Sequence, residues 1–232
     1  MRVLAIGDVH GCARALETLL EAVAPLAEDL VVTLGDYFNK GHDVRGAFVA
    51  LRHLAGATQL ISLLGNHDEQ FLVALAERDD LYMRSFGRRA LASYALEPSQ
   101  AAEFPRSDRE FLADCQLYYE TETHLFVHAN ARSTLSLAEQ DPSTLRYTRL
   151  ERDQVAHGSG KTLVCGHSAQ VDGRILDLEH TIGVDTFACG GQWLTCLEVH
   201  SGQIWQASEA GELRAGWRGD PALTRVVARP RA

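Results

Sequence analysis

The chain contains 232 residues, of which 46% are hydrophobic and 23% are charged, and its formal net charge is −9. This length and composition are typical of one globular domain with room for an insertion. The acidic balance argues against sequence-independent nucleic-acid binding, which requires a basic surface. The sequence has no apolar run near the roughly 20 residues that span a bilayer, so we expect neither a nucleic-acid nor a membrane partner.

The cysteines and the first residues predict the compartment. The five cysteines are odd in number and no two are spaced as Cys-x-x-Cys, which disfavours a disulfide framework and a zinc knuckle. The N-terminal stretch MRVLAIGD lacks the long apolar segment of a secretory signal. We therefore expect reduced thiols and a cytoplasmic protein.

The first third of the chain alternates strands and helices. Apolar runs predict strands at 2–6, 30–34 and 59–64. Apolar residues at helical spacing predict helices over 12–24, 44–51 and 71–75. Pro25 ends the first helix. This rhythm, at about 30 residues per unit, predicts parallel strands in an α/β fold.

The rhythm changes after residue 78. Residues 79–115 are polar and helical in character, which predicts a helical insertion or cap. Short strands are expected at 117–121, 124–128, 162–166, 174–178, 193–199 and 203–207. Turns at Asp172-Gly173 and Ser201-Gly202 suggest antiparallel hairpins. We expect one domain over residues 1–207, with the insertion inside it, and a loosely held tail over 208–232.

Polar residues follow five of the expected strands. The motifs that end them are GDVHG, GD, GNHD, HAN and GHS, and they supply Asp8, His10, Asp36, Asn66, His128 and His167. Ligands of parallel α/β sheets collect at the carboxyl ends of the strands, so we expect these side chains to converge. Imidazole, amide and carboxylate ligands in this mixture suit Mn, Fe or Zn better than Mg or Ca. The sequence therefore predicts a site for two divalent ions.

These motifs, in this order, resemble the blocks of the metallophosphoesterase (calcineurin-like) superfamily. The segment LAEQDPSTLRYTR also resembles a phosphate-binding segment of bacterial Ser/Thr protein phosphatases and symmetrical diadenosine tetraphosphatases, and GVDTFACGGQWLTCLEV resembles the family's closing strands. The resemblance implies a two-sheet β-sandwich flanked by helices, with a dinuclear metal site at the strand ends. It also implies metal-dependent hydrolysis of phosphoesters, in which a metal-bridging water or hydroxide attacks phosphorus.

The resemblance assigns a role to each matching position. One ion would be bound by Asp8 and His10, both ions by Asp36, and the second ion by Asn66, His128 and His167. His67 would be the general acid, and Arg149 would hold phosphate oxygens. Mn is the first expectation for both ions, with Fe or Zn as alternatives.

The stretch GDYFNKG departs from the family pattern, because Asn39-Lys40-Gly41 stands where Asp-Arg-Gly is usual. We expect that Asn39 can still accept a hydrogen bond from His67 through its amide oxygen, but it supplies no negative charge to stabilise an imidazolium. Lys40 keeps a positive charge for phosphate and loses the bidentate fork of Arg. Substrates with a good leaving group would suffer least from these two changes.

Three functions remain open at this point. The first is hydrolysis of phosphomonoesters, including phosphorylated proteins, in the manner of a Ser/Thr protein phosphatase. The second is hydrolysis of a dinucleoside polyphosphate such as diadenosine tetraphosphate. The third belongs to another class, a non-catalytic module that binds metal or phosphate. The first is our main interpretation.

Overall fold

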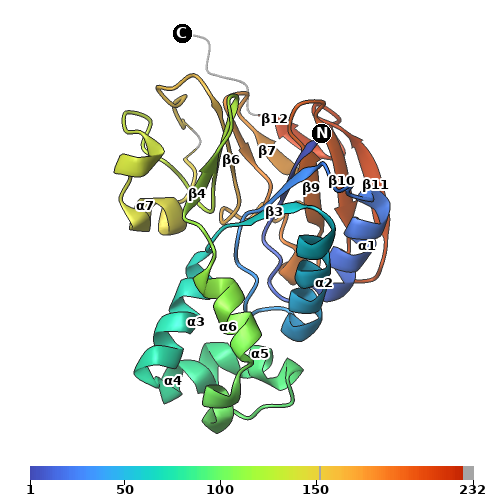
Figure 1. The fold of residues 1–232 in the computed structure, drawn as a ribbon. Coiled ribbons are helices and arrows are strands. Elements are labelled where there is room, and N and C mark those ends of the chain that lie inside the picture. The colour runs from blue at the N-terminus through green and yellow to red at the C-terminus, as the bar shows by residue number, and fades with distance from the viewer. Residues whose placement is uncertain (152, 227–232) are drawn as a thin grey trace.

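The structure is a computed structural model, and it describes residues 1–151 and 153–226. Two six-stranded sheets form the centre of the fold (Figure 1). The strand order is β11-β10-β9-β1-β2-β3 in the first sheet and β12-β7-β8-β6-β5-β4 in the second. None of the helices in the described ranges is long and apolar enough to cross a membrane.

The first sheet contains the three expected parallel strands, which are β1 (Val3–Ile6), β2 (Leu30–Thr33) and β3 (Gln59–Ser62). Helices α1 (Ala13–Val23) and α2 (Val44–Ala57) connect them, and α3 (Asn66–Glu77) follows β3. The sheet continues through β9 (Leu194–Glu198), β10 (Gln203–Ala207) and β11 (Leu213–Trp217), each antiparallel to its neighbour. The predicted hairpin at Ser201-Gly202 is therefore confirmed.

The second sheet mixes parallel and antiparallel strands. Its members are β4 (Tyr118–Glu120), β5 (His124–Val127), β6 (Thr162–Cys165), β7 (Ile175–Asp177), β8 (Thr181–Gly183) and β12 (Thr224–Val226). Helix α7 (Pro142–Tyr147) lies between β5 and β6 in the chain. The turn at Asp172-Gly173 does not join a hairpin, because β6 pairs with β5 and β8 while β7 pairs with β8 and β12.

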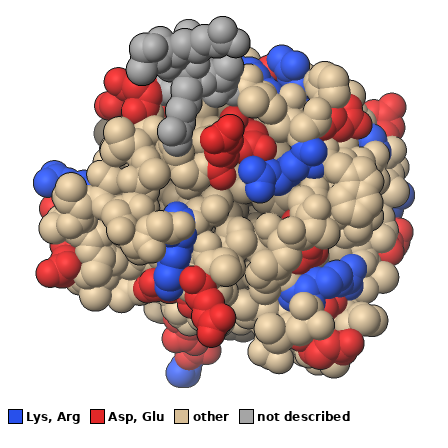
Figure 2. Space-filling view, turned by 90° about the horizontal axis from the view of Figure 1, so that it is seen from above, with Lys and Arg blue, Asp and Glu red and all other residues tan. Residues whose placement is uncertain are grey.

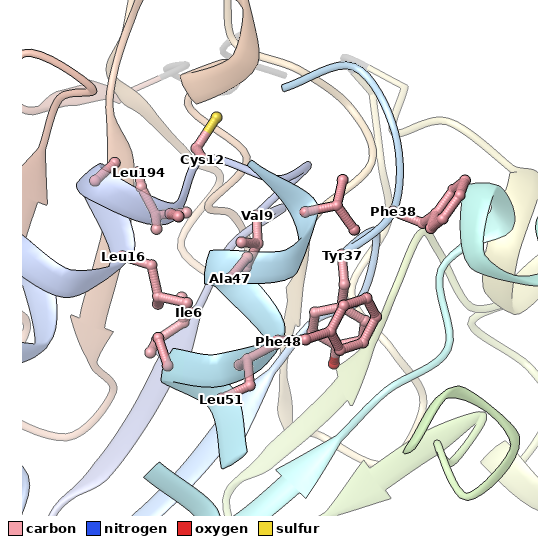
Figure 3. Close-up of a cluster of buried hydrophobic side chains, with 14 of the residues drawn as sticks. Ile6, Val9, Cys12, Leu16, Tyr37, Phe38, Ala47, Phe48, Leu51 and Leu194 are labelled. Atoms are coloured by element: carbon pink, nitrogen blue, oxygen red, sulfur yellow. The ribbon is translucent and has the colours of Figure 1, made fainter. Parts of the chain in front are cut away.

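Alternation along β1 explains how the layers are held together. Val3 and Ala5 belong to the buried cluster that also contains Phe126 and Val164 of the second sheet. Leu4 and Ile6 point to the other face, where they join α1 and α2. Figure 3 shows part of this second cluster. The sheets therefore pack on each other, with α1 and α2 covering the outer face of the first.

Residues 79–115 are helical, as expected. They form α4 (Asp80–Tyr82), a π-helical turn (Met83–Gly87), α5 (Arg88–Ser93), a 3-10 segment (Pro98–Glu103) and α6 (Arg106–Ala113). Figure 1 shows them beside α3 at one end of the molecule, below the sheets. Figure 2 shows the opposite end, where basic and acidic side chains are interspersed.

The expectation of a loosely held tail over 208–232 is wrong for the part that the structure describes. Residues 213–217 and 224–226 are the edge strands β11 and β12. Arginines fix this segment: Arg214 lies 4.3 Å from the ring centroid of Trp193, and Arg218 donates to both carboxylate oxygens of Asp177 at 2.9 Å. Residues 227–232 lie outside the described ranges.

Candidate metal centre

The loops after β1, β2, β3, β5 and β6 meet at one edge of the two sheets. Two contacts show how closely the carboxylates of the centre approach the backbone of neighbouring loops. A Cβ on Gly65 would lie 2.1 Å from Asp36 Oδ1, and a Cβ on Gly166 would lie 2.0 Å from Asp8 Oδ1. Only glycine fits at these two positions, which explains the residue that precedes Asn66 and the one that precedes His167.

Four of the predicted ligands converge on one point. Asn66 Oδ1 lies 3.1 Å from His128 Nε2 and 2.9 Å from His167 Nδ1. Asp36 Oδ1 lies 3.6 Å from His128 Nε2. Ligand atoms of Asp36, His128 and His167 all lie within 4.8 Å of one another. The structure thus brings together the whole set that the sequence assigned to the second ion.

Asp36 also faces a second group. Its Oδ2 lies 3.3 Å from His10 Nε2, and ligand atoms of His10, Asp36 and His67 lie within 4.8 Å of one another. His67 therefore stands at the edge of the first group, while Asp36 is shared by both. Asp8 is buried beside them and accepts the backbone N–H of His167 at 3.1 Å. Its role as a ligand stays a prediction.

Backbone carbonyls fix the orientation of the three imidazoles. Nδ1 of His128 donates to Leu34 O at 2.7 Å, Nδ1 of His10 to Phe38 O at 3.2 Å, and Nε2 of His167 to Tyr147 O at 3.1 Å. Each bond places the proton on the outer nitrogen and leaves the lone pair of the other nitrogen facing the cluster.

The electrostatics favour a bound cation. Burial lowers the pKa of His128 and of His167 to about 4, so both imidazoles are neutral at pH 7. Burial also raises the pKa of Asp36 to about 7. Lone pairs of two imidazoles, an amide oxygen and a carboxylate face one another, and Asp36 Oδ1 also accepts the backbone N–H of His67 at 3.0 Å. A divalent ion would stabilise this arrangement. The residues present therefore fit the metal site that the sequence predicts.

The two unusual residues of GDYFNKG lie directly against the centre. Asn39 Nδ2 is 2.8 Å from His67 Nδ1, and Lys40 Nζ is 2.8 Å from His10 Nε2. The Asn39 contact runs through the amide nitrogen, whereas the sequence predicted the oxygen. Asn39 Oδ1 is buried without a hydrogen-bond partner, and a half-turn of the carboxamide would bring this oxygen to His67. Burial and the Lys40 charge lower the pKa of His67 to about 3.

Arg149 is exposed at the rim of the centre. Its charge lowers the pKa of His167 and that of Asp185, although burial has the largest effect on both residues. The guanidinium is therefore close enough to the centre to act electrostatically on its buried side chains. A role in holding phosphate stays a prediction.

Two buried carboxylates near the centre escaped the sequence analysis. Asp68 Oδ1 accepts the backbone N–H groups of Tyr37 at 3.0 Å and Phe38 at 2.9 Å, and its Oδ2 accepts that of Gly65 at 3.0 Å. Asp185 is buried. The pKa of Asp8 is raised mainly by its own burial and also by the negative charge of Asp185. Asp68 lies in the motif GNHD and Asp185 in GVDT. Their place in these motifs was the sequence feature that could have identified them.

Comparisons with known proteins show which proteins this chain is similar to. A symmetrical bis(5'-nucleosyl)-tetraphosphatase of Janthinobacterium sp. (strain Marseille) is 30% identical over 142 residues, which cover 60% of this chain and 47% of the relative. The chain thus spans about half the length of that curated relative.

Two solved structures share the fold. A crystal structure of a candidate diadenosine tetraphosphatase has a TM-score of 0.66 and 23% identity, and covers 94% of this chain and 95% of its own. A cold-active protein-tyrosine phosphatase of a psychrophilic Shewanella species has a TM-score of 0.64 and 18% identity, and covers 92% of this chain and 80% of its own.

The match to a family model covers more of the chain than the match to the curated relative. Residues 1–190 match the sequence model of the calcineurin-like phosphoesterases. This range includes every predicted ligand and both unusual residues of GDYFNKG. The chain therefore belongs to the calcineurin-like phosphoesterase family.

Proposed function

We propose that the protein hydrolyses dinucleoside polyphosphates, of the class of diadenosine tetraphosphate, in a reaction that depends on two divalent ions. This is the second of the three functions left open by the sequence. The name of the curated relative supports it over our main interpretation, phosphomonoester hydrolysis. The observation that carries the proposal is the contact between Asn39 and His67.

The carboxamide of Asn39 next to His67 does little to help His67 donate a proton. Asn39 has no charge with which to stabilise an imidazolium, and the pKa of His67 is lowered to about 3 by burial and by Lys40. The imidazole is therefore neutral at pH 7. An alcohol such as serine leaves as a strong base and needs a proton, whereas a nucleotide phosphate leaves as a stable anion. The site suits the second kind of leaving group.

The cationic residues suit a chain of phosphates. Lys40 supplies an ammonium at the metal-facing atom of His10, and Arg149 supplies a guanidinium on the side of His167. Two positive side chains on different sides of the centre can neutralise more than one phosphate. The proposed ligands are Asp8, His10, Asp36, Asn66, His128 and His167. When bound, the ions acidify a water molecule and neutralise charge on phosphate.

The proposed ions are Mn first, with Fe or Zn as alternatives, since the ligands mix imidazole nitrogen with carboxylate and amide oxygen. All five cysteines are unpaired in the structure. This supports a reducing compartment, the cytoplasm, as the place of the reaction.

The test compares diadenosine tetraphosphate with a phosphoserine peptide, using protein that has been stripped of metal and reconstituted with Mn²⁺. We expect higher kcat/KM on the dinucleotide. His128→Ala is the control, because it removes a ligand and should abolish turnover of both substrates. Faster hydrolysis of the peptide would restore the phosphomonoesterase interpretation. Metal binding without turnover of either substrate would support the non-catalytic module.

A further inference from the structure

A pocket of about 310 Å³ opens beside α3 and the helical segment that follows it. Its walls include Glu69, Val73 and Glu77 of α3, Tyr82 and Phe86 of the inserted segment, and Tyr147 at the end of α7. The volume falls at the lower end of the range of small-molecule sites, roughly 300–1,000 Å³.

Tyr147 and helix α3 connect the walls of the pocket to the metal centre. Tyr147 accepts from His167 Nε2 through its backbone oxygen at 3.1 Å, and its hydroxyl donates to Glu69 Oε2 at 2.7 Å. Helix α3 begins with Asn66 and His67 at the centre and runs along the pocket. From His67 to Val73 the helix rises about 9 Å. A ligand in the pocket would therefore begin close to the leaving-group side of the centre.

The apolar walls are open to solvent. Phe86 is 64% exposed, Val73 is 47% exposed and Tyr147 is 39% exposed. The rings of Tyr82 and Phe86 lie 5.7 Å apart between centroids and are inclined by 42°. Exposed aromatic rings around a hollow offer flat faces on which a nucleobase can stack.

The polar walls are acidic, and this restricts the chemical class of ligand that the pocket can bind. Glu69, Glu77 and Asp79 line the pocket, and the Arg146 guanidinium already pairs with Glu69. Carboxylates accept hydrogen bonds from an amino group or from ribose hydroxyls, and they repel phosphate. The phosphate chain would then stay with Lys40 and Arg149, and the uncharged end of the substrate would enter the pocket.

We propose that this pocket binds one nucleoside of the substrate, with the base stacked on Phe86 and its neighbouring rings. The proposal rests on the proposed function, because a dinucleoside polyphosphate joins a nucleoside to the phosphate chain that the metal centre would take. It adds a specificity determinant that a phosphopeptide could not use.

The test separates binding of the nucleoside from hydrolysis. Adenosine, which carries no phosphate, is the ligand in saturation-transfer difference NMR with the full chain. Phe86→Ala removes the stacking ring, and Val73→Trp fills the pocket. Leu81→Ala is the matched control, since Leu81 is 78% exposed on the same segment and is not among the residues lining the pocket.

We expect both pocket variants to weaken the adenosine signal. We also expect them to raise the KM for diadenosine tetraphosphate, relative to the KM for p-nitrophenyl phosphate, by roughly 5- to 100-fold. Leu81→Ala should leave both readings within about two-fold of the wild type. The proposal is overturned if the wild type does not bind adenosine, or if the pocket variants behave like Leu81→Ala.

The two proposals fail separately. Hydrolysis of diadenosine tetraphosphate that is insensitive to both pocket variants would leave the proposed function standing and remove the nucleoside pocket. Adenosine binding that the variants abolish, without hydrolysis of the dinucleotide, would leave the pocket standing and remove the proposed substrate.

Discussion

Asp68 should be the residue that holds the loop after β2 against the start of α3. It is fully buried, and its carboxylate accepts three backbone N–H groups, from Tyr37, Phe38 and Gly65. Asp68→Ala leaves these three buried donors without an acceptor. Each unsatisfied donor costs about 1–3 kcal/mol. Partial access of water to the cavity offsets some of this, so we expect a loss of about 4–5 kcal/mol in the free energy of unfolding.

Asp68→Asn distinguishes loss of the hydrogen bonds from loss of volume. The amide oxygen can still accept from Tyr37 and Phe38. The amide nitrogen would face the N–H of Gly65, donor against donor. We expect this variant to lose about 2–3 kcal/mol, clearly less than Asp68→Ala.

Urea unfolding followed by tryptophan fluorescence measures both losses, with Asp114→Asn as an exposed control expected within about 0.5 kcal/mol of the wild type. Mn²⁺ titration gives an independent reading. Because Asp68 orients the loop that carries Asp36, we expect affinity to fall roughly 10- to 100-fold. A loss of stability below about 1 kcal/mol in Asp68→Ala would refute the reasoning, as would equal losses in the two variants.

Three further predictions concern the acid, the phosphate contact and stability at low pH. Asn39→Asp should raise turnover of phenyl phosphate relative to p-nitrophenyl phosphate by roughly 10- to 100-fold, because His67 would gain a carboxylate partner; an unchanged ratio would contradict this. Lys40→Ala should raise the KM for phosphate substrates roughly ten-fold, whereas Lys40→Arg should stay close to the wild type. An unchanged KM in Lys40→Ala would argue against a contact between Lys40 and phosphate. Burial raises the pKa of Asp29, but hydrogen bonds from Arg2 outweigh it and hold this pKa at about 2. Because that pKa lies below the unfolded value of about 3.9, the ionised carboxylate adds about 2–3 kcal/mol to the free energy of unfolding above pH 4. Urea unfolding should therefore show the wild type more stable than Asp29→Asn above pH 4, and this difference should disappear between about pH 4 and 2.

Short-range patterns were sufficient to predict the strands that carry the centre. Each is an apolar run that ends in glycine or in a ligand residue, and β1, β2 and β3 follow the expected parallel order. The same patterns missed β8, β11 and β12. These strands have three to five residues, and β11 contains Gly216 and alternates only weakly in burial. Their pairing depends on neighbours far away in the chain, which no local pattern encodes.

The side chains of the centre divide in the same way. His128, His167 and Asn66 were predicted as ligands because their ligand chemistry is visible in the residue type, and the structure brings the three side chains together. Asp68 accepts the nearby Gly65 N–H at the start of α3, but its other two donors, Tyr37 and Phe38, are distant in the sequence, so its role as the acceptor for the loop after β2 appears only in the fold. The nitrogen contact of Asn39 was missed for a related reason, since either end of a carboxamide satisfies the same sequence pattern.

The stretch GDYFNKG can now be explained by what holds it. Asn39 and Lys40 have left-handed backbones with φ of 62° and 60°, which costs about 1–2 kcal/mol each. Phe38 stacks on Phe71 at 3.5 Å between ring centroids, and Nη1 of Arg89 donates to Lys40 O at 2.6 Å. These anchors offset the backbone cost and direct both side chains into the centre. Because Arg89 belongs to the inserted segment, that segment is part of the machinery that positions Lys40, and its sequence should vary together with the Asn-Lys pair rather than as a free surface.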